Sequence, residues 1–419
     1  MAKSGNIIVI GAGPAGSIAG ALLSKKGYRV IILERDAFPR FCIGESLLPQ
    51  CMEFIEQAGM LDAVRKAGFQ LKSGAAFLHN GQHSEFCFAD KFTPGFDYTY
   101  QVQRDRFDAL LADEAQRIGV EIRWRQEVIA ADFSSGQPDL TVRDRSTGRD
   151  YRITADFVLD ASGFGRVLPR LLDLEKPSEF PVRQALFTHL EDRIDDAGYD
   201  RTKIRIVVHP ELTDVWYWLI PFSNGRCSLG VVGEPAAFDR SPEPDRQTIF
   251  RRFIAEDPGL SALLKNAVFD TPVSSIVGYS ANVKNLYGHG FALLGNAGEF
   301  LDPVFSSGVT VAMKSATLAV EVLDRQLKGL KVDWQADFAE PLQKGLETFR
   351  AFVTAWYEGG LQDIVFFPKI KQAEQMNNIK AMICSILAGY AWDERNPYVK
   401  NPHLRLNTLV KLCREPGLL

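Results

Sequence analysis

The sequence has no long apolar run, no excess of basic residues and no paired cysteines, and each absence excludes a class of protein. No stretch approaches the roughly 20 consecutive apolar residues of a membrane-spanning helix. The amino terminus shows no secretion-signal pattern, so we expect a cytoplasmic protein. The net charge of −4 and the pI of about 6.0 leave no basic face for nucleic acid.

Cysteine and histidine are scarce and scattered along the 419 residues. None of the six cysteines forms a C-x-x-C pair, and the six histidines show no H-E-x-x-H spacing. We therefore expect neither a disulfide framework nor a metal site, and we interpret the cysteines as reduced thiols of the core.

A glycine-rich loop is present near the amino terminus. The apolar run Asn6–Ile10, typical of a strand buried on both faces, leads directly into Gly11-Ala12-Gly13-Pro14-Ala15-Gly16. A helix is predicted over residues 17–26 and a second strand over residues 29–33, with Glu34 at its end.

This order of elements predicts a dinucleotide-binding unit. Gly11 permits a tight turn, Gly13 lets the backbone approach a pyrophosphate, and Gly16 lets the helix pack closely on the sheet. The helix would direct its first N–H groups at the phosphates, and Glu34 would bind a ribose hydroxyl. The alternative is a glycine-rich turn with a purely structural role.

The remaining patterns favour an α/β fold: a Rossmann-like domain with an inserted antiparallel sheet and a helical C-terminal region. Short apolar runs predict further parallel strands at 121–124 and 157–160, and alternating segments predict an antiparallel sheet between 182 and 233. A long helix is predicted over residues 309–328. We place the nucleotide-binding domain at 1–72, 100–165 and 275–330, the substrate domain at 73–99 and 166–274, and the helical region at 331–419.

Three stretches, at 101–108, 160–163 and 295–298, resemble segments of the aromatic-hydroxylase group of FAD proteins. The resemblance implies FAD as the cofactor, with Arg104 and the turn after Gly295 reaching it. The group carries aspartate after that glycine, whereas Asn296 stands here and removes the charge.

Two further motifs resemble those of flavin-dependent halogenases. Residues 216–221 match W-x-W-x-I-P, and residues 300–308 match F-x-x-P-x-x-S-x-G. Phe38-Pro39-Arg40 and residues 44–49 extend the resemblance along most of the first 330 residues. The candidate cofactor residues are Gly11, Gly13, Pro14, Ala15, Gly16, Glu34, Arg35, Arg40, Ser46, Arg104, Asp160, Gly163, Asn296, Pro303 and Gly308.

The halogenase resemblance implies a mechanism centred on Lys72. Reduced FAD, supplied by a separate flavin reductase, would use oxygen to oxidise chloride or bromide to hypohalous acid, which reaches this lysine and is directed at an electron-rich ring. The amine would be buried and dry, so its pKa should be lowered. An ordinary exposed lysine is the alternative.

Two other groups are candidates for the halide and substrate side. Ser306, Ser307 and Gly308 open a helix and suit a halide ion or the flavin edge, although a simple helix cap would look the same. Trp216 and Trp218 lie on one side of a strand, either as a wall between flavin and substrate or as core packing.

Phe305 stands where tryptophan-type halogenases carry a glutamate. Its presence indicates a phenol-like or pyrrole-like substrate, either free or tethered to an acyl or peptidyl carrier protein. Basic residues near the carboxyl end, Lys400, Arg405, Lys411 and Arg414, would meet such a carrier or form a solvated helix face.

Other activities of the same architecture stay open at this point. They are an FAD monooxygenase, an oxidoreductase of the geranylgeranyl-reductase type, and a flavin-binding protein without turnover.

Overall fold

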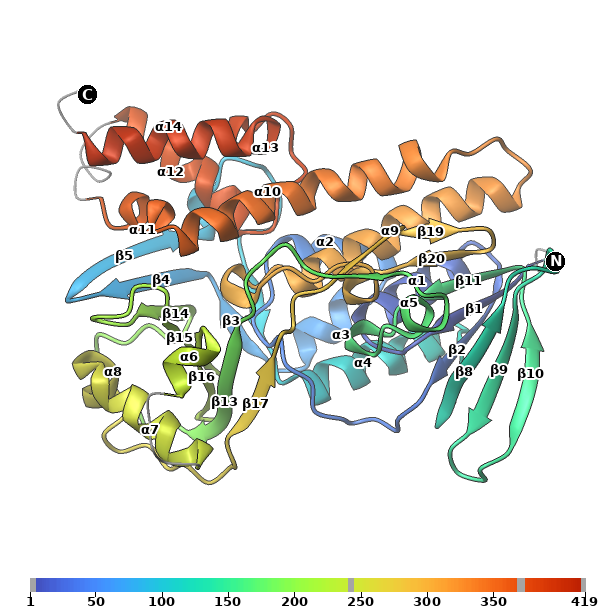
Figure 1. Ribbon diagram of the computed structural model, residues 1–419, viewed down its shortest axis with the longest axis horizontal. Coiled ribbons are helices and arrows are strands. Elements are labelled where there is room, and N and C mark those ends of the chain that lie inside the picture. Colours follow the sequence, from blue (N-terminus) through green and yellow to red (C-terminus); the bar gives the residue numbers. More distant parts are fainter. Residues whose placement is uncertain (1–4, 240–244, 368–373, 416–419) are drawn as a thin grey trace.

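The computed structural model describes residues 5–239, 245–367 and 374–415 (Figure 1). Two large β-sheets form the body of the molecule, and the helices of the C-terminal region form a layer along one side of it, at the top of Figure 1. Within the described residues, no helix combines the length and apolarity that crossing a membrane requires.

The first sheet is the parallel sheet that the apolar runs predict. Its order is β19 (Tyr287–Gly288), β20 (Phe291–Leu293), β11 (Phe157–Asp160), β1 (Asn6–Ile10), β2 (Arg29–Glu34) and β7 (Glu121–Trp124). All neighbours are parallel except the pair β19 and β20. The predicted parallel strands at 121–124 and 157–160 are therefore confirmed, and the central strands are buried on both faces.

Helices cover this sheet. The chain turns from β1 into α1 (Pro14–Lys25), which packs against α4 (Arg104–Arg117) and α9 (Gly308–Leu327). The long helix predicted over 309–328 is α9, displaced by one residue. Two shorter helices, α2 (Gln50–Ala58) and α3 (Leu61–Lys66), follow the loop after β2, and α5 (Val167–Leu171) follows β11.

The second sheet has seven strands and contains the predicted antiparallel segments. Its order is β17 (Ser274–Val277), β13 (Gln184–Glu191), β16 (Arg226–Gly233), β15 (Trp216–Pro221), β14 (Lys203–Val208), β4 (Gly74–His79) and β5 (Gln82–Cys87). One pairing, β14 with β4, is parallel, so this sheet is mixed rather than wholly antiparallel. The two strands belong to distant segments, and no hairpin obliges them to run in opposite directions.

Alternation along β15 divides its side chains between two cores. Trp216, Trp218 and Ile220 face the main core, whereas Tyr217 and Leu219 belong to a second cluster beneath the helices on the other face. Those helices are α6 (Pro235–Phe238), α7 (Arg246–Glu256) and α8 (Pro258–Leu263). Both tryptophans are thus turned toward the nucleotide-binding sheet.

Three small sheets complete the body. A meander of β8 (Gln126–Asp132), β9 (Asp139–Asp144) and β10 (Asp150–Thr154) was not predicted, because its alternation is short and largely polar. A pair of β3 (Gln70–Lys72) and β6 (Thr99–Gln101) sets Lys72 opposite Thr99. A third pair joins β12 (Glu175–Lys176) to β18 (Asn282–Val283).

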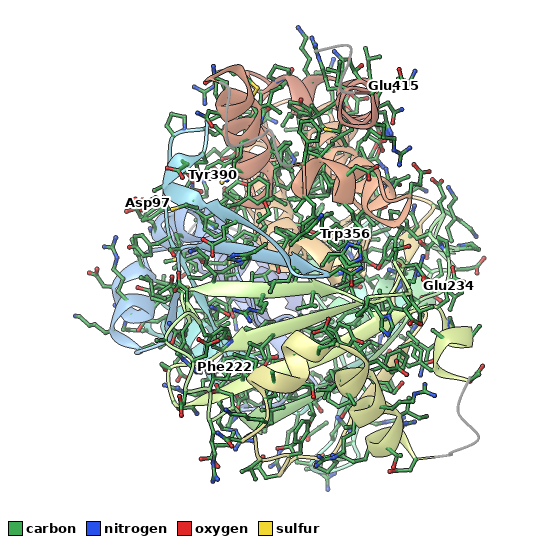
Figure 2. All side chains as sticks on the ribbon, turned by 90° about the vertical axis from the view of Figure 1, so that its left-hand side faces the viewer. Asp97, Phe222, Glu234, Trp356, Tyr390 and Glu415 are labelled. Atoms are coloured by element: carbon green, nitrogen blue, oxygen red, sulfur yellow. The ribbon has the colours of Figure 1, made fainter. Side chains whose placement is uncertain are left out.

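The C-terminal region is helical, as predicted. It consists of α10 (Glu340–Tyr357), α11 (Gly360–Val365), α12 (Glu374–Leu387), α13 (Pro397–Lys400) and α14 (Pro402–Arg414). Trp356 of α10 lies between these helices and the seven-stranded sheet (Figure 2). Residues 368–373 and 416–419 of this region lie outside the described residues. The domain boundaries proposed above stay predictions.

Replacing Gly16 by alanine should destabilise the protein. A Cβ there would lie 1.9 Å from the carbonyl oxygen of Gly11, so helix and loop would have to separate. We expect the free energy of unfolding of the protein to fall by about 1–3 kcal/mol in a urea titration. Gly13→Ala is the matched control, because its Cβ would meet its nearest neighbour, Arg40, at 3.7 Å. Equal midpoints for the two variants would contradict this account.

Candidate flavin and halogenation site

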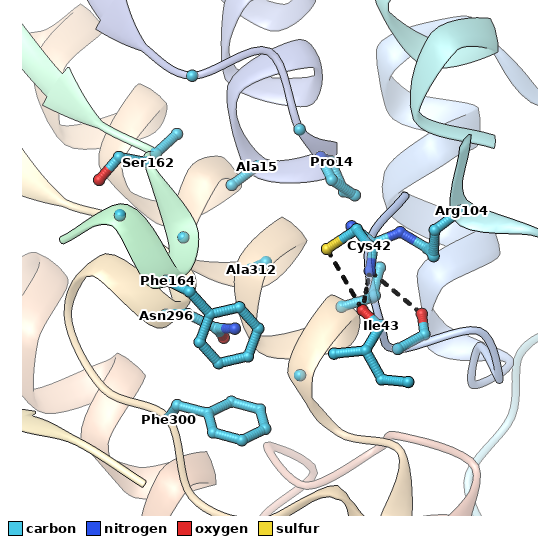
Figure 3. Close-up of a pocket in the computed structure, with 18 of the residues that line it drawn as sticks. Pro14, Ala15, Cys42, Ile43, Arg104, Ser162, Phe164, Asn296, Phe300 and Ala312 are labelled. Atoms are coloured by element: carbon cyan, nitrogen blue, oxygen red, sulfur yellow. Dashed lines mark hydrogen bonds between the residues drawn. The ribbon is translucent and has the colours of Figure 1, made fainter. Parts of the chain in front are cut away.

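A cavity of about 590 Å³ lies between the carboxyl ends of the parallel strands and the inner face of the seven-stranded sheet. Figure 3 shows part of its lining, with Pro14 and Ala15 at the start of α1 and with Phe164 and Phe300 along another side. The predicted site residues that line it are Gly11, Gly13, Pro14, Ala15, Glu34, Arg35, Arg40, Ser46, Arg104, Gly163, Trp216, Trp218, Asn296, Pro303, Ser306 and Gly308.

The glycine loop forms the mouth of helix α1. Gly11 has φ +96°, and a Cβ there would lie 2.7 Å from the carbonyl oxygen of Ala161, so both conformation and space require glycine. Gly13 precedes the helix and makes no side-chain cap, so the first N–H groups of α1 have no capping side chain. Gly16 does not line the cavity but sets the distance of α1 from the loop. These residues form a cradle that fits a pyrophosphate.

Glu34 also shapes this loop. Its carboxylate accepts hydrogen bonds from the backbone N–H of Ala12 at 2.8 Å and of Asp36 at 3.0 Å. It is 4% exposed and still borders the cavity. The side chain therefore orders the phosphate loop in addition to the predicted contact with a ribose.

Arg104 holds the chain segment that forms another wall. Its guanidinium makes two hydrogen bonds to Asp108, and its Nη1 donates to the carbonyl oxygens of Ile43 at 2.9 Å and Gly44 at 3.2 Å (Figure 3). Burial alone would lower the pKa of Arg104, but the Asp108 carboxylate raises it by more, so the guanidinium stays protonated. Arg104 thus borders the cavity while fixing the loop that continues into Glu45 and Ser46.

Asp160 is a predicted cofactor residue that does not border the cavity. It is fully buried, and it accepts hydrogen bonds from the backbone N–H of Ser162 at 2.9 Å and of Leu168 at 2.6 Å. These bonds set the turn that presents Gly163, with φ +59°, to the cavity. Asp160 therefore acts on the cavity through the backbone.

The turn before α9 places its residues on two sides. Pro303, Ser306 and Gly308 border the cavity, and Ser306 adopts a left-handed φ of +57°. Ser307 occupies the N-cap position of α9, but its side chain makes no capping hydrogen bond, so the simple cap interpretation does not hold. Phe305 points away from the cavity and packs against Phe352 and Trp356.

Lys72 is buried directly behind the cavity wall. It is 1% exposed, and its ammonium donates to Ser46 Oγ at 2.7 Å and to the carbonyl oxygen of Leu47 at 2.8 Å. The ring centre of Phe88 lies 5.4 Å from Nζ, and no carboxylate of the described residues forms an ion pair with the amine. Burial lowers the pKa of Lys72 to about 7. Because Ser46 borders the cavity, the amine lies one hydrogen bond away from it.

Sequence reasoning missed a hydrogen-bonded pair at the same wall, between a buried glutamate and a half-buried histidine. Glu45 is 1% exposed, and one of its oxygens accepts a 2.6 Å hydrogen bond from Nε2 of His189. No donor among the described residues reaches its other oxygen. Burial lowers the pKa of His189, but the hydrogen bond to Glu45 outweighs it and raises that pKa. Glu45 lies within the 44–49 stretch that resembles halogenases, whereas His189, 144 residues away, carries no local signal.

The described residues contain no cluster of three histidine, cysteine or acidic side chains that could hold a metal ion. The polar groups that border the cavity are instead backbone groups, arginines, hydroxyls, side-chain amides and the carboxylates of Glu34, Asp36, Glu45 and Glu127. This donor set, with an apolar floor and a tryptophan wall, fits an anionic dinucleotide that carries a flat ring system.

Comparison with known proteins agrees with this geometry. The FAD binding domain family matches residues 5–334. A flavin-dependent halogenase of Armillaria mellea is 30% identical over 354 residues, which cover 78% of this chain and 68% of that protein. A 1H-pyrrole-2-carbonyl-(peptidyl-carrier protein) chlorinase of Pseudomonas fluorescens is 26% identical over 376 residues, covering 84% of this chain and 83% of the chlorinase.

A crystal structure described as a flavoprotein/dehydrogenase from Cytophaga hutchinsonii has the same fold. It is 44% identical to this chain, with a TM-score of 0.93, and the match covers 98% of this chain and 100% of that one. The fold, the cavity and the sequence matches lead to one assignment: the chain is an FAD-dependent enzyme and belongs to the flavin-dependent halogenase family.

Proposed function

We propose that this enzyme halogenates an electron-rich aromatic ring, a phenol or a pyrrole, with hypohalous acid delivered at Lys72. The observation that carries the proposal is the position of the Lys72 amine. It is buried, lacks an ionic partner among the described residues, and lies one hydrogen bond behind the cavity wall at Ser46.

The residues at the mouth of α1 would hold the pyrophosphate of FAD, with Gly13, Pro14 and Ala15 nearest to it. Glu34 would bind the ribose, and Arg35, Arg40, Arg104, Asn296, Pro303 and Gly308 would contact other parts of the cofactor. When bound, reduced FAD would supply two electrons to oxygen, and the halide would supply the other two, so that one oxygen atom leaves as water and the other forms hypohalous acid. A separate flavin reductase would provide it in that form.

Ser306, Ser307 and Gly308 would hold the halide at the start of α9. The first turn of α9 has no capping side chain, and Ser306 and Gly308 border the cavity, so the N–H groups at this helix start would be the donors for an anion. Trp216 and Trp218, on the opposite wall, would keep the ring of the substrate away from the cofactor.

The lowered pKa of Lys72 explains why it suits this role. With a pKa of about 7, the amine exchanges between ammonium and free base near neutral pH. The ammonium form can donate a hydrogen bond to hypohalous acid, and the free base can take the halogen as a haloamine. An exposed lysine would stay charged and offer only the first option.

The ring that accepts the halogen would be one that loses its proton without help from an additional base in the enzyme. Phe305 carries no carboxylate and packs into the core, so the turn provides no proton acceptor of the kind expected for tryptophan. The name of the Pseudomonas chlorinase specifies a pyrrole on a peptidyl carrier protein, which supports a carrier-tethered acceptor here. Lys400, Arg405 and Lys411 are exposed on α13 and α14, where they would meet an acidic carrier.

Location of the enzyme in the cytoplasm stays a prediction.

A second candidate is an FAD oxidoreductase or monooxygenase that does not use halide. It is favoured by the Cytophaga protein, which is described as a flavoprotein/dehydrogenase and matches nearly the whole chain. The two candidates differ in one simple respect: substrate consumption by the second needs neither chloride nor bromide.

Lys72→Met should abolish halogenated product while FAD remains bound, because the variant keeps the buried volume but removes the amine. The assay would supply a flavin reductase, NADH, oxygen and bromide over a panel of phenols and pyrroles, with mass-spectrometric detection. Lys314→Met is the matched control, since Lys314 is another lysine whose pKa burial lowers, and it contacts Trp392 rather than the cavity. Brominated product from Lys72→Met would exclude the proposed role.

The same substitution should change how stability depends on pH. In the unfolded chain Lys72 binds a proton below about 10.4, whereas in the folded protein it does so only below about 7. As pH falls between these values, the wild type therefore loses stability that Lys72→Met keeps. Relative to wild type, the free energy of unfolding of the variant should rise by on the order of 2 kcal/mol from pH 9 to pH 7. A pH-independent difference in urea titrations would show that the amine is not buried as described.

Gly13→Ala should weaken FAD binding without unfolding the protein. The added methyl fits the local backbone, with φ −67°, but it projects toward the cradle where the pyrophosphate would lie. We expect the dissociation constant of FAD to rise at least about tenfold in a fluorescence titration of the flavin-free protein. Wild-type affinity in this variant would mean that the pyrophosphate binds elsewhere.

A further inference from the structure

Three side chains that are remote in sequence form a hydrogen-bonded chain beside the cavity. Trp216 of β15 donates its indole N–H to the hydroxyl of Tyr357 at 3.1 Å. Tyr357, the last residue of α10, donates that hydroxyl to Oδ2 of Asp302 at 3.0 Å. Asp302 immediately precedes the Pro303–Phe305 turn and is 2% exposed.

The direction of this chain is fixed by chemistry. An indole nitrogen can only donate, so the Tyr357 oxygen must accept from Trp216. The single hydrogen of Tyr357 is then left for Asp302, which must accept it. The chain is complete only when the Asp302 oxygen that faces Tyr357 carries no proton.

The same carboxylate also fixes the turn that carries Pro303 and Ser306. Its second oxygen, Oδ1, accepts from the backbone N–H of Val304 at 3.0 Å, and the hydroxyl of Tyr279 reaches Oδ2 at 3.4 Å. One buried group therefore restrains two different walls of the cavity: the indole of Trp216 and the turn that leads into α9.

We propose that Asp302 and Tyr357 are positioning residues, which lock the indole of Trp216 in the cavity wall and tie it to the turn before α9. Neither side chain borders the cavity, so both act through Trp216 and the backbone. The carboxyl-terminal end of α10 is thereby part of the active-site support.

The groups around Asp302 determine the pH range in which the hydrogen-bonded chain from Trp216 to Asp302 is complete. Tyr279, Tyr357 and Arg183 face it; the guanidinium of Arg183 lies 4.0 Å from the ring centre of Tyr357 and forms ion pairs with Asp214 and Glu234. Burial raises the pKa of Asp302 to about 6. Above this pH the carboxylate accepts all its donors. Below this pH, Asp302 carries a proton. On Oδ2 this proton faces the tyrosine hydroxyls, and on Oδ1 it faces the N–H of Val304, so the hydrogen-bonded chain from Trp216 to Asp302 is interrupted.

The test is fluorine NMR of the FAD-bound protein labelled with 5-fluorotryptophan. The chain has six tryptophans, and Trp216→Phe assigns the resonance of interest. In the wild type, the Trp216 resonance should shift in a step near pH 6. Tyr357→Phe should displace this resonance and remove the step, and Asp302→Asn should remove the step because it abolishes the ionisation.

Two variants serve as matched controls. Ser228→Ala removes the acceptor of the other wall tryptophan, Trp218, whose indole donates to Ser228 Oγ at 3.0 Å; it should displace the Trp218 resonance and leave the pH step of Trp216 in place. Tyr279→Phe removes a hydroxyl from Asp302 without interrupting the path to Trp216, so the pH step should remain. Both positioning residues are tested separately, so failure of one variant to fold leaves the other.

The catalytic consequence rests on the proposed halogenation. A loosened Trp216 should lower the yield of halogenated product per reduced FAD consumed severalfold in Tyr357→Phe, with the balance appearing as hydrogen peroxide and FAD affinity unchanged. The NMR measurement needs no turnover, so it separates the two proposals. If Tyr357→Phe leaves the Trp216 resonance in place, or if the pH step persists in Asp302→Asn, the proposed positioning role is contradicted even if the enzyme halogenates. Absence of halogenation with the expected spectra would refute only the proposed function.

Discussion

The close approach of α1 to the loop before it is the constraint on which the site depends. Gly16 lies so near the carbonyl oxygen of Gly11 that no larger residue fits, and this contact holds the start of the helix over the carboxyl ends of the parallel strands. The N-terminus of α1 therefore forms one wall of the cavity. The other walls, from the Arg104-held loop to the turn before α9, are arranged around this point.

A single loop connects the cofactor cavity with the buried amine. Arg104 holds the backbone of Ile43 and Gly44, and the chain continues directly into Ser46, which accepts the hydrogen bond from Lys72. Because water is excluded and no carboxylate of the described residues compensates its charge, the amine has a pKa near neutrality. The same segment thus borders the cavity on one side and orients the candidate catalytic group on the other.

The C-terminal helix α10 contacts residues that form two walls of the cavity. Trp356 packs against Phe305 at the turn before α9, and the adjacent Tyr357 connects that turn with the tryptophan wall. Substitutions in α10 are therefore expected to act on the cavity although they lie far from the nucleotide-binding loop in sequence. This arrangement connects the helical region to two walls of the cavity, the indole of Trp216 and the turn before α9.

The sequence alone determined the nucleotide-binding unit, the parallel strands and the α9 helix, because local apolar runs and glycine spacing encode them directly. Motifs that follow the strands also indicated part of the cavity lining, for example Gly11, Gly13 and Gly308. Only the tertiary structure decided that Phe305 faces the core, that Asp160 acts through the backbone, and that β14 pairs in parallel with β4. The pairs Glu45–His189 and Asp302–Tyr357 likewise became visible only in three dimensions, because packing between distant segments, rather than local spacing, brings those side chains within hydrogen-bonding distance.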